Sequence, residues 1–510
     1  MTTLVTGTDT LTRDALTVLQ PGFVGTTAPD WILRRIGEGL SSVGLFGRNI
    51  VDPEQLAALT ARLRAERDDV LVAIDEEGGD VTRLEVNQGS SFPGNYALGS
   101  VDDVELTRAV ARELGRRLAA CGVDLNWAPS ADVNSNAANP VIGVRSFGAD
   151  PDLVARHTVA YVDGLQGVGV AACTKHFPGH GDTNVDSHHA LPRIDVDLTT
   201  LHARELVPFR AAIAAGTKAV MSAHILLSAL DPERPATLSP QILTGLLRQE
   251  LGFEGLIVTD GMEMRAVAAT YGIERGSVLA IAAGADAICV GGGLADEDTV
   301  LRLRDALVDA VRTGELPEER LADAAARVRA LASWTQAHRA RGAASVPGAA
   351  SQEGTAPGAD IGLVAARRAL TVTRGERPYT PMTGAPYVAA FTPVANFAVG
   401  DETPWGIAAE LERLLPGTET GSYADGSVDA VLTAAGERRI VAVVRDAHRH
   451  PWMTAALDSL LAARPDTVVV EMGLDEAEPR GALHIATHGA ARVCGRAAAE
   501  ALVGTPPDRS

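Results

Sequence analysis

The sequence has few cysteines and no long apolar run. Its four cysteines (Cys121, Cys173, Cys289 and Cys494) are far apart, without CxxC or other metal-ligand spacing, so we interpret them as buried reduced thiols. No apolar stretch reaches the roughly 18 residues that cross a bilayer. The start, MTTLVTGTDTLTRDALTV, has no positive end followed by an apolar run. We therefore expect no membrane span, no secretory signal and a cytoplasmic location.

Positive charge is also scarce. The chain has 45 Lys and Arg against 65 Asp and Glu, and its formal net charge is −20. Such a field repels polyanions, so nucleic acids and anionic membrane surfaces are poor candidate partners. A neutral or cationic small-molecule substrate fits better, and nothing in the sequence indicates an oligomeric state.

Lysine is nearly absent, since only Lys175 and Lys218 occur. Arginine fills the other basic positions, yet Lys175 remains beside His176 at the end of a strand-like run. A compact ammonium and a planar guanidinium are not interchangeable in a tight polar pocket. This pattern favours a functional role for Lys175, with chance retention as the alternative.

Short apolar runs alternate with helical stretches through the first two thirds of the chain. The runs are rich in Val and Ile, whereas the segments 54–67, 103–120 and 204–215 show helical apolar spacing. Eight β-then-α repeats predict a closed (β/α)₈ (TIM) barrel within an α/β fold. The eight strand-like runs lie at 16–22, 43–46, 70–74, 123–127, 170–174, 219–223, 256–260 and 287–290.

The last third of the chain has a different organisation. Residues 335–360 lose apolar periodicity and are rich in Ala, Gly, Pro and Ser, which is typical of a linker. Residues 361–510 then alternate strand-like runs with helical stretches at 405–415, 452–463 and 490–502. The strand-like runs are YVAAF, RIVAVV, DTVVVE and LHIAT. We therefore predict a barrel domain over 1–334, a linker over 335–360, and a smaller layered α/β domain, like an αβα sandwich, over 361–510.

Ionisable side chains follow five consecutive strands of the predicted barrel. In such barrels the side chains available for chemistry lie where strands end and the βα loops begin. Each residue alone has a structural explanation, and Asp260 could cap the helix that follows it. Five in a row favour a ligand site, because clustered polar groups cost stability unless they serve one. The residues are Asp75, Asp132, Lys175 with His176, His224 and Asp260.

The loop after the fifth strand, KHFPGHGDTNVDSHHALP (Lys175 to Pro192), contains four histidines and two aspartates. Metal binding is one interpretation, but no HExxH or comparable ligand spacing is present. The other is proton transfer, because Asp186 and His188 project to the same side of an extended loop. The carboxylate can then orient the imidazole and stabilise its protonated form. We favour proton transfer, without a metal or other cofactor.

Several motifs together resemble glycoside hydrolase family 3, in its β-N-acetylglucosaminidase branch. They occur in the family's order and cover about residues 15–334, whereas the C-terminal part resembles the family's second domain only in position and class. The motifs are PGFVGTTAPDW, GLFGRNI, IDEEGGDVTRL, GVRSFGADP, KHFPGHGDTNVDSHHALP and LIVTDGMEM.

The resemblance implies an exo-acting, retaining, two-step hydrolysis of N-acetylglucosaminides. The family's nucleophile falls on Asp260, and its acid/base dyad falls on Asp186 and His188. Retaining enzymes hold their two catalytic groups only about 5 Å apart. The family's substrate-binding positions fall on Asp75, Arg83, Arg145, Lys175 and His176.

Some features leave alternatives open. The family often has a basic residue where this chain has Asp80. The acidic residue could alter the outer part of the site, but we expect a solvated carboxylate there. Gly291–Gly293 after the eighth strand could be a phosphate-holding loop or a tight turn. A glycoside phosphorylase on the same scaffold is the main alternative function, because a neutral histidine acid/base would not repel incoming phosphate. A non-catalytic sugar-binding protein and a metal-dependent hydrolase are further alternatives. The substrate could be a cell-wall muropeptide, as in peptidoglycan recycling, a chitin fragment or another glycoside.

Overall fold

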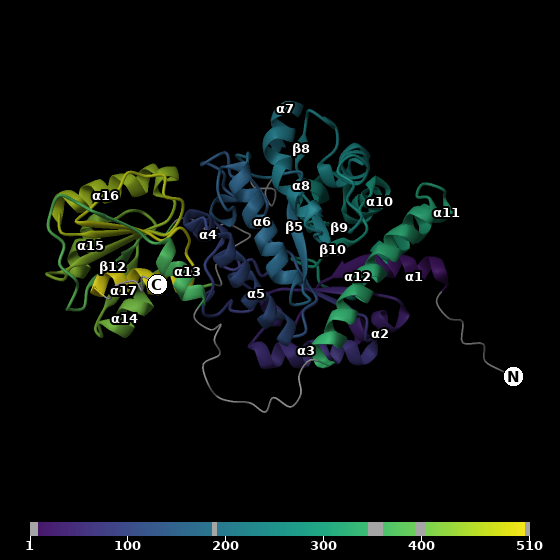
Figure 1. Ribbon diagram of the computed structural model, residues 1–510, viewed down its shortest axis with the longest axis horizontal. Coiled ribbons are helices and arrows are strands. Elements are labelled where there is room, and N and C mark those ends of the chain that lie inside the picture. Colours follow the sequence, from purple (N-terminus) through teal and green to yellow (C-terminus); the bar gives the residue numbers. More distant parts are fainter. Residues whose placement is uncertain (1–8, 186–190, 345–360, 393–402, 505–510) are drawn as a thin grey trace. The chain divides into compact units, whose positions relative to one another are not determined.

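A computed structural model describes residues 9–185, 191–344, 361–392 and 403–504 (Figure 1). The chain divides into two compact units. The first unit comprises Met1–Glu76, Ala111–Val133 and Thr158–Gly354, and the second comprises Glu77–Val110, Asn134–His157 and Thr355–Ser510. Two segments that separate barrel strands along the chain, 77–110 and 134–157, are thus grouped with the C-terminal residues. This division into units does not test the predicted domain boundaries at 334 and 361, which remain a prediction.

All eight strand-like runs of the first two thirds form strands of a parallel barrel. Six strands pair in the order β2-β3-β4-β5-β7-β9, β1 pairs with β10, and a bridge between Val258 and Ala287 joins β9 to that pair. The predicted fold class is therefore confirmed. The strands are β1 Leu19–Pro21, β2 Ser42–Leu45, β3 Leu71–Ile74, β4 Leu125–Asn126, β5 Ala171–Phe177, β7 Ala219–Ser222, β9 Leu256–Thr259 and β10 Ile288–Val290.

The contact between β1 and β2 differs from the other strand contacts of the barrel. Among the described strands no backbone ladder joins these two, although they lie side by side. Instead, the Ser42 hydroxyl donates a hydrogen bond to the Leu19 carbonyl at 3.1 Å. Side chains therefore help to close the barrel here.

The barrel interior is packed with small and medium side chains at alternate strand positions. Leu71 and Ala73, two apart on β3, belong to one buried cluster with Ala171 and Cys173, two apart on β5. The indole of Trp127 and residues of helix α12 (Glu318–Ala344) complete the cluster. This spacing of two residues is what a strand requires to turn one face inward. The site must therefore lie at the strand ends, because the interior itself is filled.

Helices alternate with these strands as predicted. Several begin with an aspartate that accepts a backbone N–H, for example Asp52 from Gln55 at 2.7 Å and Asp296 from Thr299 at 2.8 Å. The helices that follow or flank the barrel strands are α1 Thr10–Thr17, α2 Asp30–Glu38, α3 Pro53–Glu66, α4 Asn95–Val101, α5 Val104–Ala120, α6 Pro151–Gln166, α8 Leu206–Ala214, the π-helix η5 Gln241–Glu250, α9 Arg265–Tyr271, α10 Ile273–Ala283 and α11 Glu297–Arg312.

The C-terminal residues form a second sheet in the order β11-β16-β15-β14-β12-β13, with β11 antiparallel and the others parallel. Helices α14 (Ala408–Leu414) and α17 (Arg492–Val503) pack on one face. Helices α15 (Val428–Ala435) and α16 (Pro451–Ala463) pack on the other, so the predicted αβα layering is confirmed. The strands are β11 Thr371–Arg374, β12 Tyr387–Ala390, β13 Glu419–Ser422, β14 Ile440–Val444, β15 Val468–Glu471 and β16 Leu483–Ala486.

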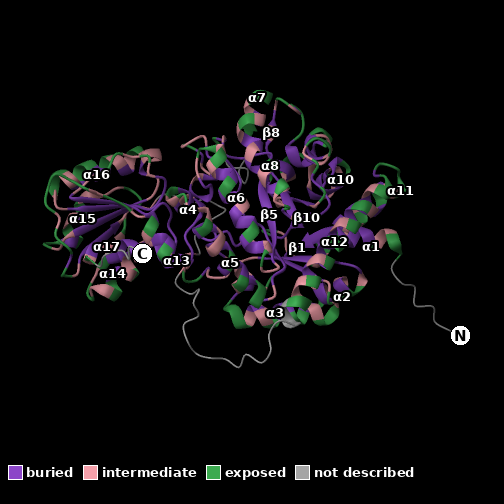
Figure 2. Cartoon of the chain, in the orientation of Figure 1, coloured by how far each residue is buried: buried purple, intermediate pink, exposed green. Residues whose placement is uncertain are grey.

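Burial follows this layering in both sheets. Figure 2 shows central strands of both sheets in the buried colour and helices that alternate between buried and exposed faces. All four cysteines are buried and none forms a disulfide, which confirms the interpretation from their spacing. No helix in the described ranges is long and apolar enough to cross a membrane.

The segment expected to be a linker begins as helix. Helix α12 continues to Ala344, so residues 335–344 extend the preceding helix. The Ala- and Arg-rich stretch that the sequence has there consists largely of good helix formers. Residues 345–360 lie outside the described residues.

Candidate active site

The carboxyl ends of β3 and β5 are joined by a buried ion pair. The Lys175 Nζ lies 2.6 Å from Asp75 Oδ1, and the Lys175 side chain is only 2% exposed against 19% for Asp75. A buried ammonium without a counter-charge would cost several kcal/mol, roughly 3–5 when one partner is removed. The pair therefore fixes both groups at the mouth of the barrel.

Asp132, which follows β4, organises the start of the histidine-rich loop. Its carboxylate accepts the backbone N–H groups of His176 and His180 at 3.2 and 2.7 Å and the Ser130 hydroxyl at 2.9 Å. It also lies 2.7 Å from the His176 Nδ1. Burial favours a higher pKa for Asp132, but His176 and these hydrogen bonds outweigh it and hold the pKa well below its usual value. Asp132 thus stays ionised and orients the His176 ring.

Asp260 directly follows β9 and does not cap a helix. Its Oδ1 accepts the backbone N–H of Gly261 at 2.8 Å, whereas α9 starts only at Arg265 and has no side-chain cap. The capping alternative is therefore wrong, because a glycine-containing turn separates the carboxylate from the helix. On the same turn, the Gly261 carbonyl accepts a hydrogen bond at 3.0 Å from Nε2 of His224, which follows β7.

The charged groups at these strand ends shift the pKa values of two buried side chains, Cys173 and His180. Burial raises the pKa of the Cys173 thiol. Asp75 and Asp260 raise this pKa further, and Lys175 opposes the rise. Burial and His176 lower the pKa of His180 to about 4, against the opposing effects of Asp132 and Asp260. The strands β3, β4, β5, β7 and β9 are consecutive in one parallel sheet, so the groups at their carboxyl ends lie along one edge of it. We call Asp75, Asp132, Lys175, His176 and Asp260 the rim cluster.

Arg83 and Arg145, the other two expected substrate-binding residues, belong to the second unit. Arg145 forms a two-pronged ion pair with Glu77, with N–O distances of 3.0 and 2.6 Å, and both side chains are buried. Arg83 is half-buried. Sequence reasoning did not identify Glu77 as the partner of Arg145, although the run DEEGG was part of the motif.

Asp80 is not solvated as expected. It is buried, forms an ion pair with Arg445, and accepts the Ala490 backbone N–H at 2.7 Å. All these groups are in the second unit. The acidic residue at this position therefore ties its loop to the strand and loop ends of the C-terminal sheet.

The proposed acid/base residues, Asp186 and His188, lie outside the described residues, as does the rest of 186–190. The part of the loop that precedes them is described and is held by Asp132 through His180. Within the described ranges, no group of three or more His, Cys, Asp or Glu side chains is arranged to hold a metal ion.

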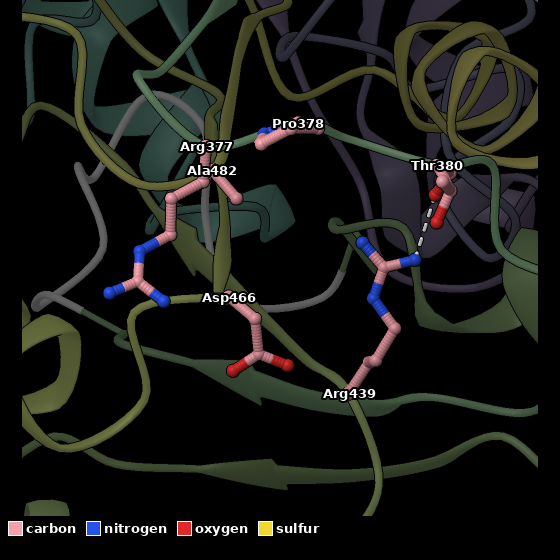
Figure 3. A pocket seen from close by; sticks show the side chains of 6 residues that line it. All are labelled: Arg377, Pro378, Thr380, Arg439, Asp466 and Ala482. Atoms are coloured by element: carbon pink, nitrogen blue, oxygen red, sulfur yellow. Dashed lines mark hydrogen bonds between the residues drawn. The ribbon is translucent and has the colours of Figure 1, made fainter.

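A pocket of about 440 Å³ lies in the second unit, away from the carboxyl ends of its strands. Figure 3 shows Arg377, Asp466 and Arg439 around it, with the Arg439 guanidinium bonded to the Thr380 carbonyl at 2.9 Å. Asp466, Arg439 and Ala482 precede β15, β14 and β16. Open parallel sheets bind ligands at the opposite, carboxyl edge, so we do not include this pocket in the candidate site.

The sequence matches the glycosyl hydrolase family 3 N-terminal domain over residues 33–331, more than half of the chain. The barrel is thus the catalytic-domain fold of a class of glycoside hydrolases. Within that class, the chain belongs to glycosyl hydrolase family 3, which confirms the resemblance.

Named relatives agree with this assignment. The chain is 36% identical over 312 residues to Beta-hexosaminidase A of Pseudoalteromonas piscicida, covering 56% of this chain and 52% of that protein. It is 38% identical over 258 residues to Beta-hexosaminidase of Chromobacterium violaceum, covering 49% and 71%. A family 3 β-N-acetylglucosaminidase structure from Paenibacillus sp. str. FPU-7 has a TM-score of 0.85 and 34% identity, covering 98% and 97%. The chain thus spans about half the length of the P. piscicida relative.

Proposed function

We propose that the protein is a retaining, exo-acting β-N-acetylglucosaminidase that works by double displacement. The observation that carries the proposal is the position of Asp260, at the carboxyl end of β9 in the same parallel sheet as the strands of the rim cluster and not on a helix start. Membership of family 3 and the names of the similar proteins supply the reaction type and the sugar.

In the proposed first step, an Asp260 carboxylate oxygen attacks the anomeric carbon while His188 donates a proton to the leaving glycosidic oxygen. A covalent glycosyl ester on Asp260 results. In the second step His188 takes a proton from water, the hydroxide attacks the same carbon, and the Asp260 carboxylate leaves. Two inversions give net retention. Asp186 would orient the imidazole and stabilise its protonated form.

The remaining rim residues are suited to holding a sugar ring. The Asp75 carboxylate can accept hydrogen bonds from two hydroxyls, and the Lys175 ammonium can donate them. His176 donates a hydrogen bond through Nδ1 to Asp132. Its Nε2 therefore lies on the side of the ring away from Asp132, where it can form a hydrogen bond with a sugar hydroxyl. We assign substrate binding to these residues and, by their family positions, to Arg83 and Arg145.

The test is to compare Asp260→Ala and His188→Ala with Asp305→Ala, a control at an exposed position of α11. On an aryl β-N-acetylglucosaminide, Asp260→Ala should lower kcat by at least about 1,000-fold, which is about 4 kcal/mol of transition-state stabilisation. His188→Ala should lose less with a strongly activated aryl leaving group, which needs little protonation. A variant Asp260→Ala with activity near that of Asp305→Ala would contradict the mechanism.

The stereochemistry and the acceptor need separate measurements. Proton NMR of the first product should show the β-anomer of N-acetylglucosamine, and an α-anomer would exclude retention. In phosphate buffer the product should be free sugar. Release of the sugar 1-phosphate would instead support the phosphorylase, an alternative that the hexosaminidase names of the relatives do not favour.

A further inference from the structure

The turn Gly291–Gly293 after β10 holds an anion, and that anion is the carboxylate of Glu263. The Oε1 of Glu263 accepts the backbone N–H groups of Gly291 at 2.9 Å, of Gly293 at 3.1 Å, and of Gly292 between them. Successive backbone N–H groups of this kind form a concave anion-binding nest. The resemblance of this glycine run to a phosphate-binding loop therefore has a physical basis, but here a side chain of the protein itself occupies the nest.

Glu263 lies three residues after Asp260, on the turn that carries the proposed nucleophile. Its second oxygen, Oε2, is buried and has no hydrogen-bond partner among the described residues. Within the described residues, this carboxylate therefore accepts its hydrogen bonds from the three amides at Oε1. These bonds connect the turn that carries Asp260 to the residues after β10.

The nest is itself fixed to the neighbouring strands by Arg48, which follows β2. Its guanidinium donates to the carbonyls of Gly291 and Gly292, the latter at 2.9 Å, and to the Phe23 carbonyl after β1 at 3.0 Å. These bonds span β10, β1 and β2 where no backbone ladder joins β1 to β2. The rim on this side is therefore a continuous hydrogen-bonded chain that ends on the turn of Asp260.

The glycines of the nest have different steric requirements. Gly291 has φ +144°, and a Cβ there would lie 2.2 Å from the Gly22 backbone nitrogen, so only glycine fits. A Cβ on Gly292 would lie 3.0 Å from Glu263 Oε1, whereas a Cβ on Gly293 would meet nothing within 4 Å. An alanine at 292 therefore crowds the carboxylate, and an alanine at 293 leaves it undisturbed.

We infer that Glu263 is a positioning residue for the nucleophile. By occupying the Gly291–Gly293 nest, it holds the turn after β9 so that the Asp260 carboxylate faces the anomeric carbon. The inference rests on the proposed role of Asp260. In this role Glu263 acts through the turn and not through contact with the substrate.

The first test compares Glu263→Ala with Glu274→Ala, whose side chain forms an exposed ion pair with Arg302 on neighbouring helices. Glu263→Ala should lower kcat by up to about 100-fold, the cost of a small misplacement of a reacting group. KM should stay nearly unchanged, because the proposed substrate-binding residues lie outside the turn after β9. Glu274→Ala should resemble the parent protein in both constants.

Chemical rescue separates positioning from general structural damage. Formate or acetate should occupy the emptied nest of Glu263→Ala and restore kcat with a saturable dependence on concentration. The product should remain β-N-acetylglucosamine, which shows that the added anion does not act as a nucleophile. The parent protein and Glu274→Ala should not respond. A loss of kcat that neither anion restores would overturn the inference.

The second test keeps Glu263 and serves if Glu263→Ala does not fold. Gly292→Ala should lower kcat several-fold and Gly293→Ala should not. Equal activity of these two variants would overturn the inference. If Asp260→Ala is inactive while Glu263→Ala and Gly292→Ala have parental kcat, only this inference is wrong. If Asp260→Ala is active, the proposed function is wrong.

Discussion

The carboxyl ends of the parallel strands carry buried or half-buried acids in both sheets, but the acids have different partners. In the barrel, Asp75 pairs with a lysine side chain, and Asp132 pairs with a histidine ring in addition to two backbone N–H groups. At the end of β15, Glu471 accepts the backbone N–H groups of Asp446, Ala447 and Gly473 at 2.8, 3.1 and 2.8 Å.

This difference distinguishes the proposed ligand site from a structural support. A carboxylate saturated by its own loops has little capacity left for a substrate, whereas side-chain pairs at a barrel mouth keep charged groups in place for one. Glu263 shows that both uses occur on one turn, because its carboxylate holds the backbone while Asp260 nearby is proposed to react. The identity of the partner is therefore more informative than burial or charge alone.

The largest expected effect tests the barrel side of the comparison. Asp75→Ala leaves the Lys175 ammonium buried without this counter-charge, so the free energy of unfolding should fall by about 3–5 kcal/mol, and substrate binding should be lost. Urea unfolding and KM measure the two effects. Glu274→Ala breaks an exposed ion pair and should cost no more than about 1 kcal/mol. An equally small cost for Asp75→Ala would mean that the Lys175–Asp75 pair is not a buried pair in solution.

The second effect tests the C-terminal sheet. Glu471→Ala removes the acceptor of three backbone N–H groups, so we expect a loss of about 3 kcal/mol in the free energy of unfolding, near 1 kcal/mol for each. The kcat on an aryl N-acetylglucosaminide should change by less than about twofold, or under 0.5 kcal/mol. A loss of activity comparable to that of Asp75→Ala, at a temperature where the variant is folded, would mean that this edge serves the reaction.

The smallest effect concerns Glu205, an acid that lies against the histidine-rich loop. Burial raises its pKa to about 7, despite the opposing effect of Arg204, and a Cβ on Gly179 of that loop would lie 2.9 Å from Glu205 Oε2. A raised pKa means that its contribution to stability is full below the unfolded value of 4.5 and is lost as the pH rises through about 7.

Glu205→Gln removes this titration. Between pH 5 and 8 the parent should lose about 2 kcal/mol of stability relative to Glu205→Gln, an order-of-magnitude figure from the raised pKa. Unfolding curves at both pH values measure the difference, with Glu274→Gln as a control that should show no such trend. A constant difference between Glu205→Gln and the parent across this range would exclude a raised pKa at Glu205.

Much of the fold could be predicted from the sequence because its strands are buried. All eight barrel strands were located by their apolar runs, and so were β12, β14, β15 and β16. The edge strands β11 and β13 were missed, because most of their residues are exposed and their sequences show no alternation of apolar and polar residues. Helix α15 was also missed.

The site was predictable only in part. Strand-end position alone indicated Asp75, Lys175 and Asp260, because parallel strands bring their carboxyl ends together. The partners of Arg145 and Asp80 could not be found this way, because Glu77 and Arg445 reach them through tertiary contacts with no regular spacing. The Glu263 nest combines two loops 28 residues apart in sequence, and only the glycine run hinted at it.

The scarcity of lysine makes the barrel easy to probe by proteolysis. Endoproteinase Lys-C cleaves after lysine, and its two target bonds follow Lys175 and Lys218. Lys175 lies within the fully buried strand β5, hydrogen-bonded between β4 and β7. Cleavage there requires the strand to open, so its rate measures the free energy of that opening. A sugar bound by Lys175 and Asp75 should slow this cut, which would report occupancy of the site without any turnover.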